Sequence, residues 1–327
     1  MKRQVIYFVL IFAGILFHSC GKKSPGLKND HLAVGKAGEV ILIMDKNVWS
    51  EQAVQQVKEI LLQPQVALPQ QEPMFDIIYL ENKAFTSNFQ KHRNIVRFEI
   101  GDNISANAFS IDKNIWASHQ LWINIKGNDP EKCLNFFIEN QKEIIKELYH
   151  NDLVRIQTLY RSETDPTIDK LIRSKFGISL IIPRQYYIAS DQPDFLWLRY
   201  RTNKNDRFVI IYKSPVQEEL NSKLLADFRD TITKKYIPGT VVGAYPIITR
   251  DWGLPIVKPF QIGNKEGFEM RGLWESVRDK MGGPLYSFTF KDQSGLSYIT
   301  VDGFVYAPQE SKRDFLREVE AIVKSLR

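Results

Sequence analysis

The stretch Glu39-Val40-Ile41-Leu42-Ile43-Met44-Asp45 decides the fold of the first half of the chain. A continuous apolar run of this length that ends in an acid is typical of a strand buried on both faces of a sheet. Apolar runs over 75–80 and 95–100 repeat the pattern, with helical spacing over 48–61 and a short helix expected over 83–91. This order of strand, helix, strand, helix and strand predicts a parallel α/β sheet with right-handed crossovers.

A hairpin and a long helix complete this half. Asn47 is expected to cap the first helix, and a hairpin around Ile115-Trp116 and 121–125 is expected to extend the sheet. From Pro130 onward, apolar residues at helical spacing lie opposite interleaved Glu and Lys residues, which indicates an amphipathic helix with a solvated face. The predicted fold class of the first half is therefore a parallel or mixed sheet with helices.

The second half follows a different pattern. Asp165 as N-cap, Pro166 at the first helical position and Gly177 at the stop delimit a helix. Another helix begins at Asn221, and a closing helix covers 312–326. Short strands separated by turn residues are expected over 178–183, 186–189, 195–201, 208–213, 244–249, 265–277, 285–291 and 297–306. This half is therefore predicted to be α+β, an antiparallel sheet packed by helices.

The N-terminus has the pattern of an export signal that ends in a lipidation site. Lys2 and Arg3 precede an apolar run over 5–17, and Ser19 stands directly before Cys20. The run is shorter than the ~20 residues of a spanning helix, which favours cleavage before Cys20 over an uncleaved signal anchor. Acyl chains on the cysteine thioether and on the new amino terminus would provide two anchors, enough for stable membrane attachment.

The residues after the lipidation site predict a tether and a location. Gly, Lys, Ser, Pro and Asn are frequent up to residue 38, without apolar periodicity. Gly21 is not the Asp that retains enterobacterial lipoproteins in the inner membrane, and no acidic cluster follows it. By this resemblance we expect the periplasmic side of the outer membrane. The predicted organisation is a signal peptide (1–19), lipidated cysteine and flexible tether (20–38), α/β domain (39–162) and α+β antiparallel-sheet domain (163–327).

Composition excludes several classes of protein. Hydrophobic residues make up 43% of the chain and charged residues 25%, which is ordinary for a globular protein. The net charge is +6, or +4 once Lys2 and Arg3 leave with the signal, and no dense Lys/Arg cluster indicates nucleic-acid binding. With Cys20 lipidated, Cys133 is left alone, which excludes an internal disulfide and a cysteine-based zinc site. Cys133 is expected to be an inert buried thiol.

Short motifs in the first half resemble an uncharacterised family. The motifs are Gly38-Glu39-Val40, Met44-Asp45, Trp49, Pro73 with Phe75-Asp76, and His92-Arg93-Asn94-Ile95. With the lipidation signal and the tether, they resemble a lipoprotein family of Bacteroidota, domain-of-unknown-function family 4837, over most of the mature chain. The resemblance implies location and architecture only, because that family has no established activity. Separately, 176–183 and 323–327 are similar to the PsbP-like fold, whose members are largely non-catalytic assembly and accessory proteins.

Familiar catalytic motifs are missing from the sequence. It has no Gly-x-Ser-x-Gly elbow, His-Glu-x-x-His pair, phosphate loop or dinucleotide glycine pattern, so no catalytic residue, metal or cofactor is predicted. The most polar cluster is His92-Arg93, in which His92 would act as a base and Arg93 as an anion clamp. Asp45 ends the first strand, a common place for ligand contacts in open α/β sheets. The alternative is a structural role, with Asp45 in a turn and His92-Arg93 pairing with Asp76 or Glu99.

Aromatic and arginine residues alternate in the strand expected over 195–201. One face would carry Phe195, Trp197, Arg199 and Arg201, and the leucines between them would face the core. Arginine planes beside aromatic rings suit anionic or sugar-like ligands, or a protein partner. The candidate surface consists of Trp197, Arg199, Arg201, Trp252, Arg271 and Trp274. The alternative is that the tryptophans pack beneath helices and the arginines pair with nearby acids.

The sequence therefore favours a lipid-anchored binding, scaffold or envelope-assembly protein over an enzyme, with an envelope protein or a glycan as its partner. An envelope-polymer hydrolase is the first alternative, and would need Asp45 and His92 to converge with another carboxylate in a cleft. A carrier of a lipid or other apolar ligand is the second alternative, and would need an enclosed cavity lined by Phe and Leu.

Overall fold

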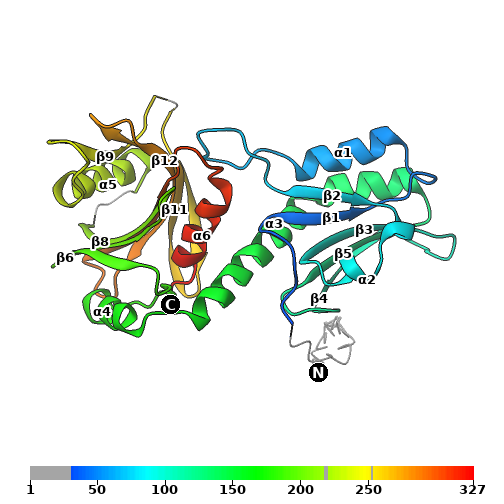
Figure 1. Ribbon diagram of the computed structural model, residues 1–327, viewed down its shortest axis with the longest axis horizontal. Helices are drawn as coiled ribbons and strands as arrows, with labels where there is room; N and C mark the ends of the chain where they lie inside the picture. Colours follow the sequence, from blue (N-terminus) through cyan, green and yellow to red (C-terminus); the bar gives the residue numbers. More distant parts are fainter. Residues whose placement is uncertain (1–30, 217–219, 252) are drawn as a thin grey trace, which may run out of the picture.

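Figure 1 shows the computed structural model of the chain, in which two sheets are connected by one long helix, α3 (Pro130–Ser162). The structure describes residues 31–216, 220–251 and 253–327. The predicted signal peptide, Cys20, the first part of the predicted tether and Trp252 lie outside the described residues. The predicted fold class, α/β followed by α+β, is confirmed.

The first sheet has five strands in the order β2-β1-β3-β5-β4. Its strands are β1 (Glu39–Ile43), β2 (Asp76–Leu80), β3 (Asn94–Ile100), β4 (Ala108–Lys113) and β5 (Leu121–Gly127). β1 pairs in parallel with β2 and β3, and β3 pairs in parallel with β5, whereas β4 is antiparallel to β5. β1 contributes to apolar clusters on both faces of the sheet, as its continuous apolar run predicts.

Helices α1 (Glu51–Leu61) and α3 cover one face of this sheet. Asn47 does not cap α1, because the chain makes a turn there first and the helix starts four residues later, at Glu51. Ser50 is the cap, and its Oγ accepts a hydrogen bond from the Ala53 N–H at 3.1 Å. The other face carries a 3-10 turn, η1 (Asn82–Ala84), and the one-turn helix α2 (Ser87–Gln90) in place of the single helix expected over 83–91.

The hairpin of the first sheet starts earlier than predicted. Its first strand is β4, and Ile115-Trp116 lies in the loop that joins β4 to β5. Asn114 ends the strand, because its φ of 60° lies in the left-handed region that a strand does not contain. Trp116 packs instead on Trp122, with their ring centroids 4.9 Å apart.

The described part of the predicted tether belongs to this folded domain. Leu32 forms an isolated bridge with Ser118 and Val34 forms one with His92, and the Ala33 side chain between them is buried. Residues 31–38 therefore run along the amino edge of the sheet, where their backbone groups find hydrogen-bond partners. The prediction of a flexible tether is wrong for this segment.

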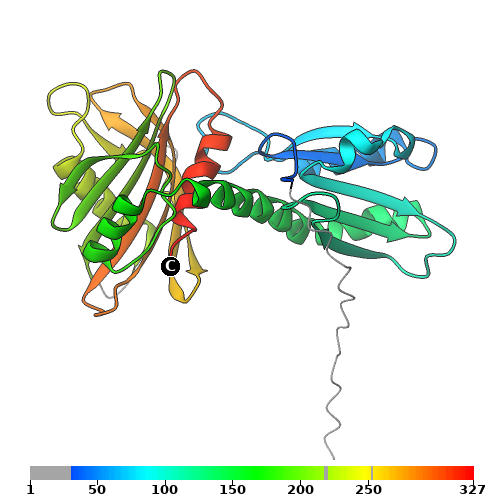
Figure 2. The ribbon, with the colours of Figure 1, turned by 60° about the horizontal axis from the view of Figure 1, so that its bottom comes forward.

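The second sheet has eight strands in the order β10-β11-β12-β13-β8-β7-β6, with β9 also paired to β11. All of these pairs are antiparallel. The strands are β6 (Tyr187–Gln192), β7 (Phe195–Arg201), β8 (Asp206–Pro215), β9 (Tyr245–Ile248), β10 (Ile256–Ile262), β11 (Lys265–Val277), β12 (Gly282–Lys291) and β13 (Ser297–Tyr306). α5 (Ser222–Tyr236) packs on one face, and α4 (Pro166–Phe176) and α6 (Arg313–Val323) pack on the other (Figure 1 and Figure 2).

The helix ends in this half follow the predicted chemistry. The Asp165 carboxylate accepts hydrogen bonds from the Thr167 and Ile168 N–H groups at 2.8 and 3.3 Å, and Gly177 ends α4 with a φ of 67°. Asn221 caps α5 by accepting a hydrogen bond from the Leu224 N–H at 2.9 Å. Local side-chain chemistry is enough to fix these boundaries.

Two segments of the second half differ from the prediction. The segment 178–183 is not a strand, because its backbone bonds to the end of the chain. Ser179 exchanges two hydrogen bonds of 3.1 Å with Arg327, and the Ile181 N–H donates to Ser325 Oγ at 2.8 Å. Strand β10 was not predicted, and it contains Pro259, which a strand tolerates only at the edge of a sheet or at a bulge. β10 is such an edge strand, and pairs with β11 alone.

No helix within the described ranges combines the length and the apolar character of a membrane span. α3 is long enough, with 33 residues, but charged side chains occur along all of it.

Candidate functional site

The tryptophans of the predicted aromatic-arginine surface lie in the core. Trp197 and Trp274 belong to the apolar cluster between the second sheet and α5, and only 3% of Trp274 is exposed. The Trp274 indole N–H donates a hydrogen bond to the Val305 carbonyl at 3.0 Å. The alternation of β7 is as predicted, but both of its faces are covered, so alternation alone did not distinguish core from surface.

The arginines of this predicted surface are separated and paired. Arg199 donates to Asp206 at 2.7 Å, and the exposed Arg201 lies 3.9 Å from the same carboxylate. Arg271 lies on the opposite face of the sheet from Trp274 and pairs with Glu320 of α6. Among the described members, the prediction of one exposed Trp/Arg surface is therefore wrong, and Trp252 lies outside the described residues.

The residues of the predicted polar site also lie apart, with Asp45 far from His92 and Arg93. Asp45 follows the carboxyl end of β1, where its two oxygens accept hydrogen bonds from the backbone N–H and the side-chain amide of Asn82, both at 2.7 Å. His92 and Arg93 precede the amino end of the parallel neighbour β3. The register separates Asp45 from His92 by about seven residues along the strands, or about 20 Å. The convergence that a hydrolase would need is therefore contradicted.

His92 and Arg93 have structural partners. The ring of His92 lies 3.2 Å from a Glu39 oxygen, and burial lowers the pKa of His92 more than Glu39 raises it. Arg93 donates to Asp152 at 3.1 Å and to the Gly35 carbonyl at 2.9 Å. These partners replace the Asp76 and Glu99 that the sequence suggested.

Asp152 of α3 is the centre of a buried charged cluster between the two domains. The Asp152 carboxylate has no exposed surface and accepts hydrogen bonds from the Gly38 N–H at 2.8 Å, Arg93 at 3.1 Å and Arg317 of α6 at 3.0 Å. Gly38 has a φ of 76°, and a Cβ there would lie 2.9 Å from the Arg317 guanidinium. The glycine thus allows both a left-handed turn and the close approach of α6.

Two acids of this cluster hold the amino end of α6. The Glu72 carboxylate, from the loop before β2, accepts hydrogen bonds from the backbone N–H groups of Lys312 and Arg313 at 2.7 and 2.9 Å. It caps the helix from a distant part of the chain and places negative charge at the positive end of the helix dipole. Arg313 also pairs with Asp76 at 2.8 Å.

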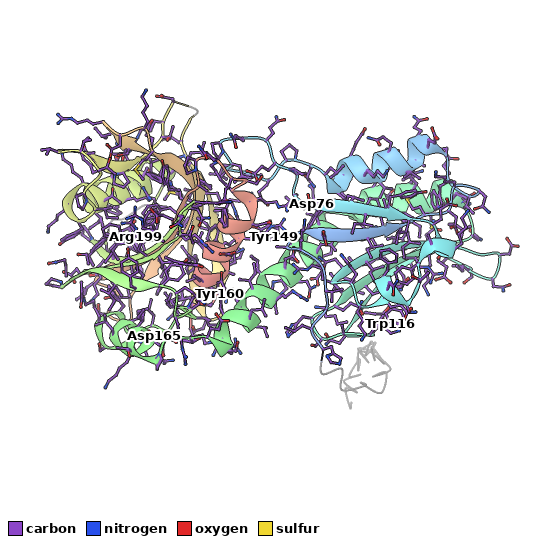
Figure 3. The ribbon with its side chains drawn as sticks, viewed as in Figure 1. Asp76, Trp116, Tyr149, Tyr160, Asp165 and Arg199 are labelled. Atoms are coloured by element: carbon purple, nitrogen blue, oxygen red, sulfur yellow. The ribbon has the colours of Figure 1, made fainter. Side chains whose placement is uncertain are left out.

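Further along α6, Glu320 is fully buried, accepts hydrogen bonds from Arg271 and the Tyr149 hydroxyl, and forms an ion pair with Lys324. Burial would raise the pKa of Glu320, but Arg271 and Lys324 outweigh burial and lower that pKa to about 2. Tyr149, labelled in Figure 3, comes from α3, so this group also joins the two domains. We call the whole set the interdomain cluster: Glu72, Asp76, Arg93, Tyr149, Asp152, Arg271, Arg313, Arg317, Glu320 and Lys324.

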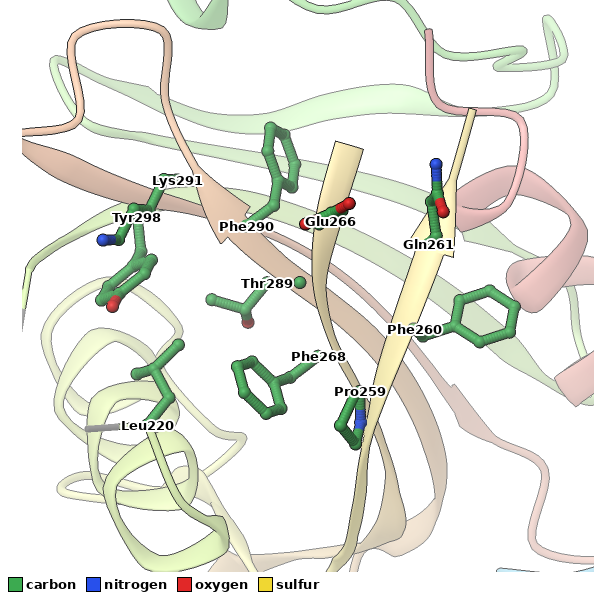
Figure 4. Close-up of a pocket in the computed structure, with 11 residues that line it drawn as sticks. Leu220, Pro259, Phe260, Gln261, Glu266, Phe268, Thr289, Phe290, Lys291 and Tyr298 are labelled. Carbon is green, nitrogen blue, oxygen red and sulfur yellow. The ribbon is translucent and has the colours of Figure 1, made fainter. Parts of the chain in front are cut away.

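A groove of about 770 Å³ lies on the α5 face of the second sheet (Figure 4). Its lining comes from the start of α5 and from strands β10 to β13: Leu220, Pro259, Phe260, Gln261, Glu266, Gly267, Phe268, Thr289, Phe290, Lys291 and Tyr298. Strand register explains why the central side chains meet, because Phe268 pairs with both Pro259 and Thr289 and cross-strand partners share a face. Leu220, Phe268 and Tyr298 surround the same space in Figure 4.

The chemistry of the groove is that of binding through apolar contact. Leu220, Pro259, Phe268 and Tyr298 provide the apolar and aromatic part of the wall, and Gln261, Glu266 and Lys291 add polar groups along it. The Thr289 hydroxyl is engaged with the Thr300 hydroxyl at 2.8 Å. Among the described residues that line this groove there is no His or Cys, and Glu266 is its carboxylate.

A second concavity, of about 730 Å³, lies beside α1. Lys46 and Lys58 lie on its wall with Trp49 and Tyr79, and the Lys58 amine lies 4.7 Å above the Tyr79 ring. The Tyr79 hydroxyl donates to the Met44 carbonyl at 2.8 Å. Within the described part of the chain, no three His, Cys, Asp or Glu side chains gather closely enough to hold a metal ion.

Sequence reasoning missed the groove. Three of its strands were predicted, and their alternation places Phe268, Thr289 and Tyr298 on one face. The fourth strand, β10, was not predicted, so the wall that it forms could not be inferred. The signal that was available is the concentration of aromatic residues at the ends of strands 265–277, 285–291 and 297–306.

Comparisons with known proteins agree with the division into two halves. Residues 33–161 match the model of a domain of unknown function (DUF8532), and residues 165–325 match another (DUF4837). A search of curated proteins finds no matching sequence. The motifs that we compared with an uncharacterised family lie within the DUF8532 match, and the Bacteroidota and PsbP-like resemblances stay predictions.

Similarity to solved structures is weak. The chain is 11% identical to the protein in "Crystal structure of LpqN involved in cell envelope biogenesis of Mycobacterium tuberculosis", with a TM-score of 0.28 over 45% of this chain and 79% of that chain. A likeness of this size carries no argument about function. The family matches thus confirm the predicted resemblance to DUF4837, in the C-terminal half of the chain, and add a match to DUF8532 in the N-terminal half; both are domains of unknown function.

Proposed function

We propose that this chain is a membrane-anchored, non-catalytic binding protein of the cell envelope that holds a partner protein in the groove between α5 and strands β10 to β13. The observation that carries the proposal is the composition of the groove. Apolar and aromatic side chains, including Phe268, form its centre, and polar groups such as Gln261 and Lys291 lie along it. This arrangement is typical of sites where a few aromatic anchors provide most of the binding energy.

The anchor in this proposal is the lipid on Cys20, and the location is the periplasmic side of the outer membrane. The sequence before and after Cys20 supports both statements. Metabolic labelling with palmitate should mark the wild-type protein and not Cys20→Ser. The anchor is refuted if the Cys20→Ser protein remains fully attached to membranes.

The interdomain cluster supports a scaffold role. Because the buried Asp152 pairs with Arg93 of one half and Arg317 of the other, and Glu320 accepts a hydrogen bond from Tyr149 of α3, the position of the groove is fixed relative to the N-terminal domain. Breaking such a pair would leave a buried charge without compensation. A partner held in the groove would therefore have a defined orientation relative to the membrane.

The test is site-specific photo-crosslinking from position 261, followed by direct binding of the purified partner that it captures. We expect Phe268→Ser to weaken that binding at least about tenfold, which corresponds to ~1.4 kcal/mol. The matched control is Leu296→Ser, which removes an apolar side chain that is 78% exposed and does not line the groove. Equal binding by both variants would refute the groove as the site, and capture of a glycan would assign it to that ligand class.

A carrier of a lipid or other apolar ligand is the second candidate. The observation in its favour is the set of apolar and aromatic groove residues Leu220, Pro259, Phe268 and Tyr298. Native mass spectrometry of protein purified from envelopes distinguishes the two candidates, because a carrier retains a co-purifying lipid that Phe268→Ser loses. A spectrum that shows only the cleaved chain with the lipid on Cys20, and no further bound mass, favours partner binding.

A further inference from the structure

We propose that the edge of the N-terminal domain at which residues 31–34 run is a membrane-contact surface, and that an anionic phospholipid bilayer is its partner. We call this surface the entry edge and define it by Leu32, Val34, Lys36, Lys91 and Trp116. The inference goes beyond the groove and rests on the proposed anchor at Cys20.

The first support is that the described chain begins here in a fixed position. Val34 N–H donates to the Lys91 carbonyl and Arg93 N–H donates to the Val34 carbonyl, both at 2.9 Å. Ala33 N–H donates to the Ser118 carbonyl at 3.0 Å. Arg155, which is buried, donates to the Ala33 carbonyl. The point at which the anchor segment joins the domain is therefore determined by the fold.

The second support is the length of the connection. Eleven residue steps separate Cys20 from His31, and even fully extended they span at most about 40 Å. This limit follows from covalent geometry alone. A lipid on Cys20 therefore keeps the entry edge close to the bilayer, whereas the second sheet lies at the other end of α3 (Figure 1).

The third support is the chemistry of the entry edge. Leu32 and Val34 are apolar but 39% and 51% exposed, and Trp116, labelled in Figure 3, lies on the same side of the domain. Apolar and aromatic side chains of this kind insert at the boundary between headgroups and acyl chains. At the entry edge these side chains would contact the bilayer next to the anchor.

Charge at the entry edge favours an anionic surface. Lys36 and Lys91 are exposed, and each cation near such a surface contributes about 1 kcal/mol. The Glu39 carboxylate is engaged within the domain, because it faces His92 at 3.2 Å and accepts the Lys36 N–H at 2.8 Å. Asp112 is exposed and opposes this attraction. The chain between Cys20 and His31 adds Lys22, Lys23 and Lys28.

Other exposed apolar side chains are the competing candidates. Val242 is 95% exposed and Leu296 is 78% exposed, but both belong to the C-terminal half. Contact of these residues with the bilayer would require the far domain to fold back toward it. They therefore serve as comparison sites in the test.

The test measures quenching of a fluorophore by brominated lipids. Bimane is attached to a single cysteine at Val34→Cys, Val242→Cys or Leu296→Cys, in a chain with Cys133→Ser, lipidated at Cys20 and reconstituted in vesicles that contain phosphatidylglycerol. We expect quenching at position 34 to be several times that at positions 242 and 296. Lys36→Gln with Lys91→Gln should reduce the quenching at 34 in these vesicles and leave it unchanged in neutral ones.

Equal quenching at the three positions, or stronger quenching at 242, would overturn the entry edge as the membrane surface. A second arm separates this failure from failure of the anchor. Unlipidated protein is joined through the Cys20 thiol to a maleimide lipid in the same vesicles, with the label carried by an unnatural residue at position 34, 242 or 296. If natural lipidation is absent but position 34 is selectively quenched in this arm, the anchor proposal fails and the entry edge stands.

Discussion

The two faces of the eight-stranded sheet are both covered by a helix but are built from different chemistry. The interdomain cluster is buried on the α6 side. Within it, the single carboxylate of Asp152 accepts hydrogen bonds from Gly38, Arg93 and Arg317. The α5 face has one fully buried pair, Arg229 with Asp302, at 2.9 Å, and beyond the start of α5 it opens into the groove. Charge is thus concentrated where the two domains meet.

The acids on the two faces differ in how well their charge is stabilised. Burial raises the pKa of Asp302 more than Arg229 lowers it. Two cations, in contrast, lower the pKa of Glu320 on the α6 face to about 2. This difference indicates that ionic contacts determine the position of α6, because a displaced helix would leave several buried charges unpaired. The α5 face depends mainly on apolar packing, which leaves it free to expose a binding groove.

The largest effect is expected from Asp152→Ala. This change leaves Arg93 and Arg317 buried without their carboxylate, and loss of one partner from such a pair costs about 3–5 kcal/mol. Urea denaturation followed by circular dichroism measures the change in the free energy of unfolding. Glu143→Ala is the control on the same helix, because Glu143 pairs with Lys146 in an exposed position and should cost less than about 0.5 kcal/mol. Similar losses for both variants would remove the distinction that we draw for the α6 face.

The next largest effect is a dependence of the free energy of unfolding on pH, which arises from Glu320. Its pKa in the folded protein, about 2, lies below its ordinary value of 4.5. The carboxylate therefore stabilises the fold fully above pH 4.5, and this contribution is lost as the pH falls toward 2. The shift corresponds to about 3 kcal/mol.

The measurement for Glu320 is the difference in unfolding free energy between the wild type and Glu320→Gln. We expect this difference to be constant above about pH 5 and to narrow below pH 4.5, because the glutamine does not titrate. Taking the difference cancels the titration of the other carboxyl groups. A difference that stays constant down to pH 3 would show that Arg271 and Lys324 do not favour the ionised form.

A smaller effect is expected from Glu72→Ala, which removes the cap of α6. The Lys312 and Arg313 N–H groups lose their acceptors, and loss of a cap costs about 1–2 kcal/mol. Glu72→Gln retains one oxygen as an acceptor and should recover part of the loss. Thermal unfolding of the three proteins checks the order, and equal stability of Glu72→Ala and the wild type would mean that the cap contributes nothing.

Much of this architecture was predictable because its causes are local. The apolar run of β1 predicts a doubly buried strand, and Asp165 and Gly177 mark the ends of α4 through their own side-chain and backbone chemistry. The face of each residue in β7 was also predictable from alternation. None of these inferences needs knowledge of a distant part of the chain.

The remaining features depend on contacts between distant segments. Trp197 and Trp274 were assigned to a surface because alternation does not reveal that α5 covers it. Asp152 lies in an amphipathic helix whose charged residues were expected in solvent, but its partners come from 38, 93 and 317. The cap of α6 comes from Glu72, 240 residues away. Such pairings are not encoded in any local window of the sequence.

The smallest effect on stability is expected from a substitution in the wall of the groove. Lys291 is exposed at its wall, so Lys291→Ala should change the free energy of unfolding by less than about 0.5 kcal/mol. The same variant should lower capture of the partner, because it removes the only lysine of the groove lining within the described residues. Chemical denaturation and crosslinking on one protein sample measure both quantities. A loss of stability above about 2 kcal/mol would mean that Lys291 supports the fold, and the α5 face would then not be free to serve binding.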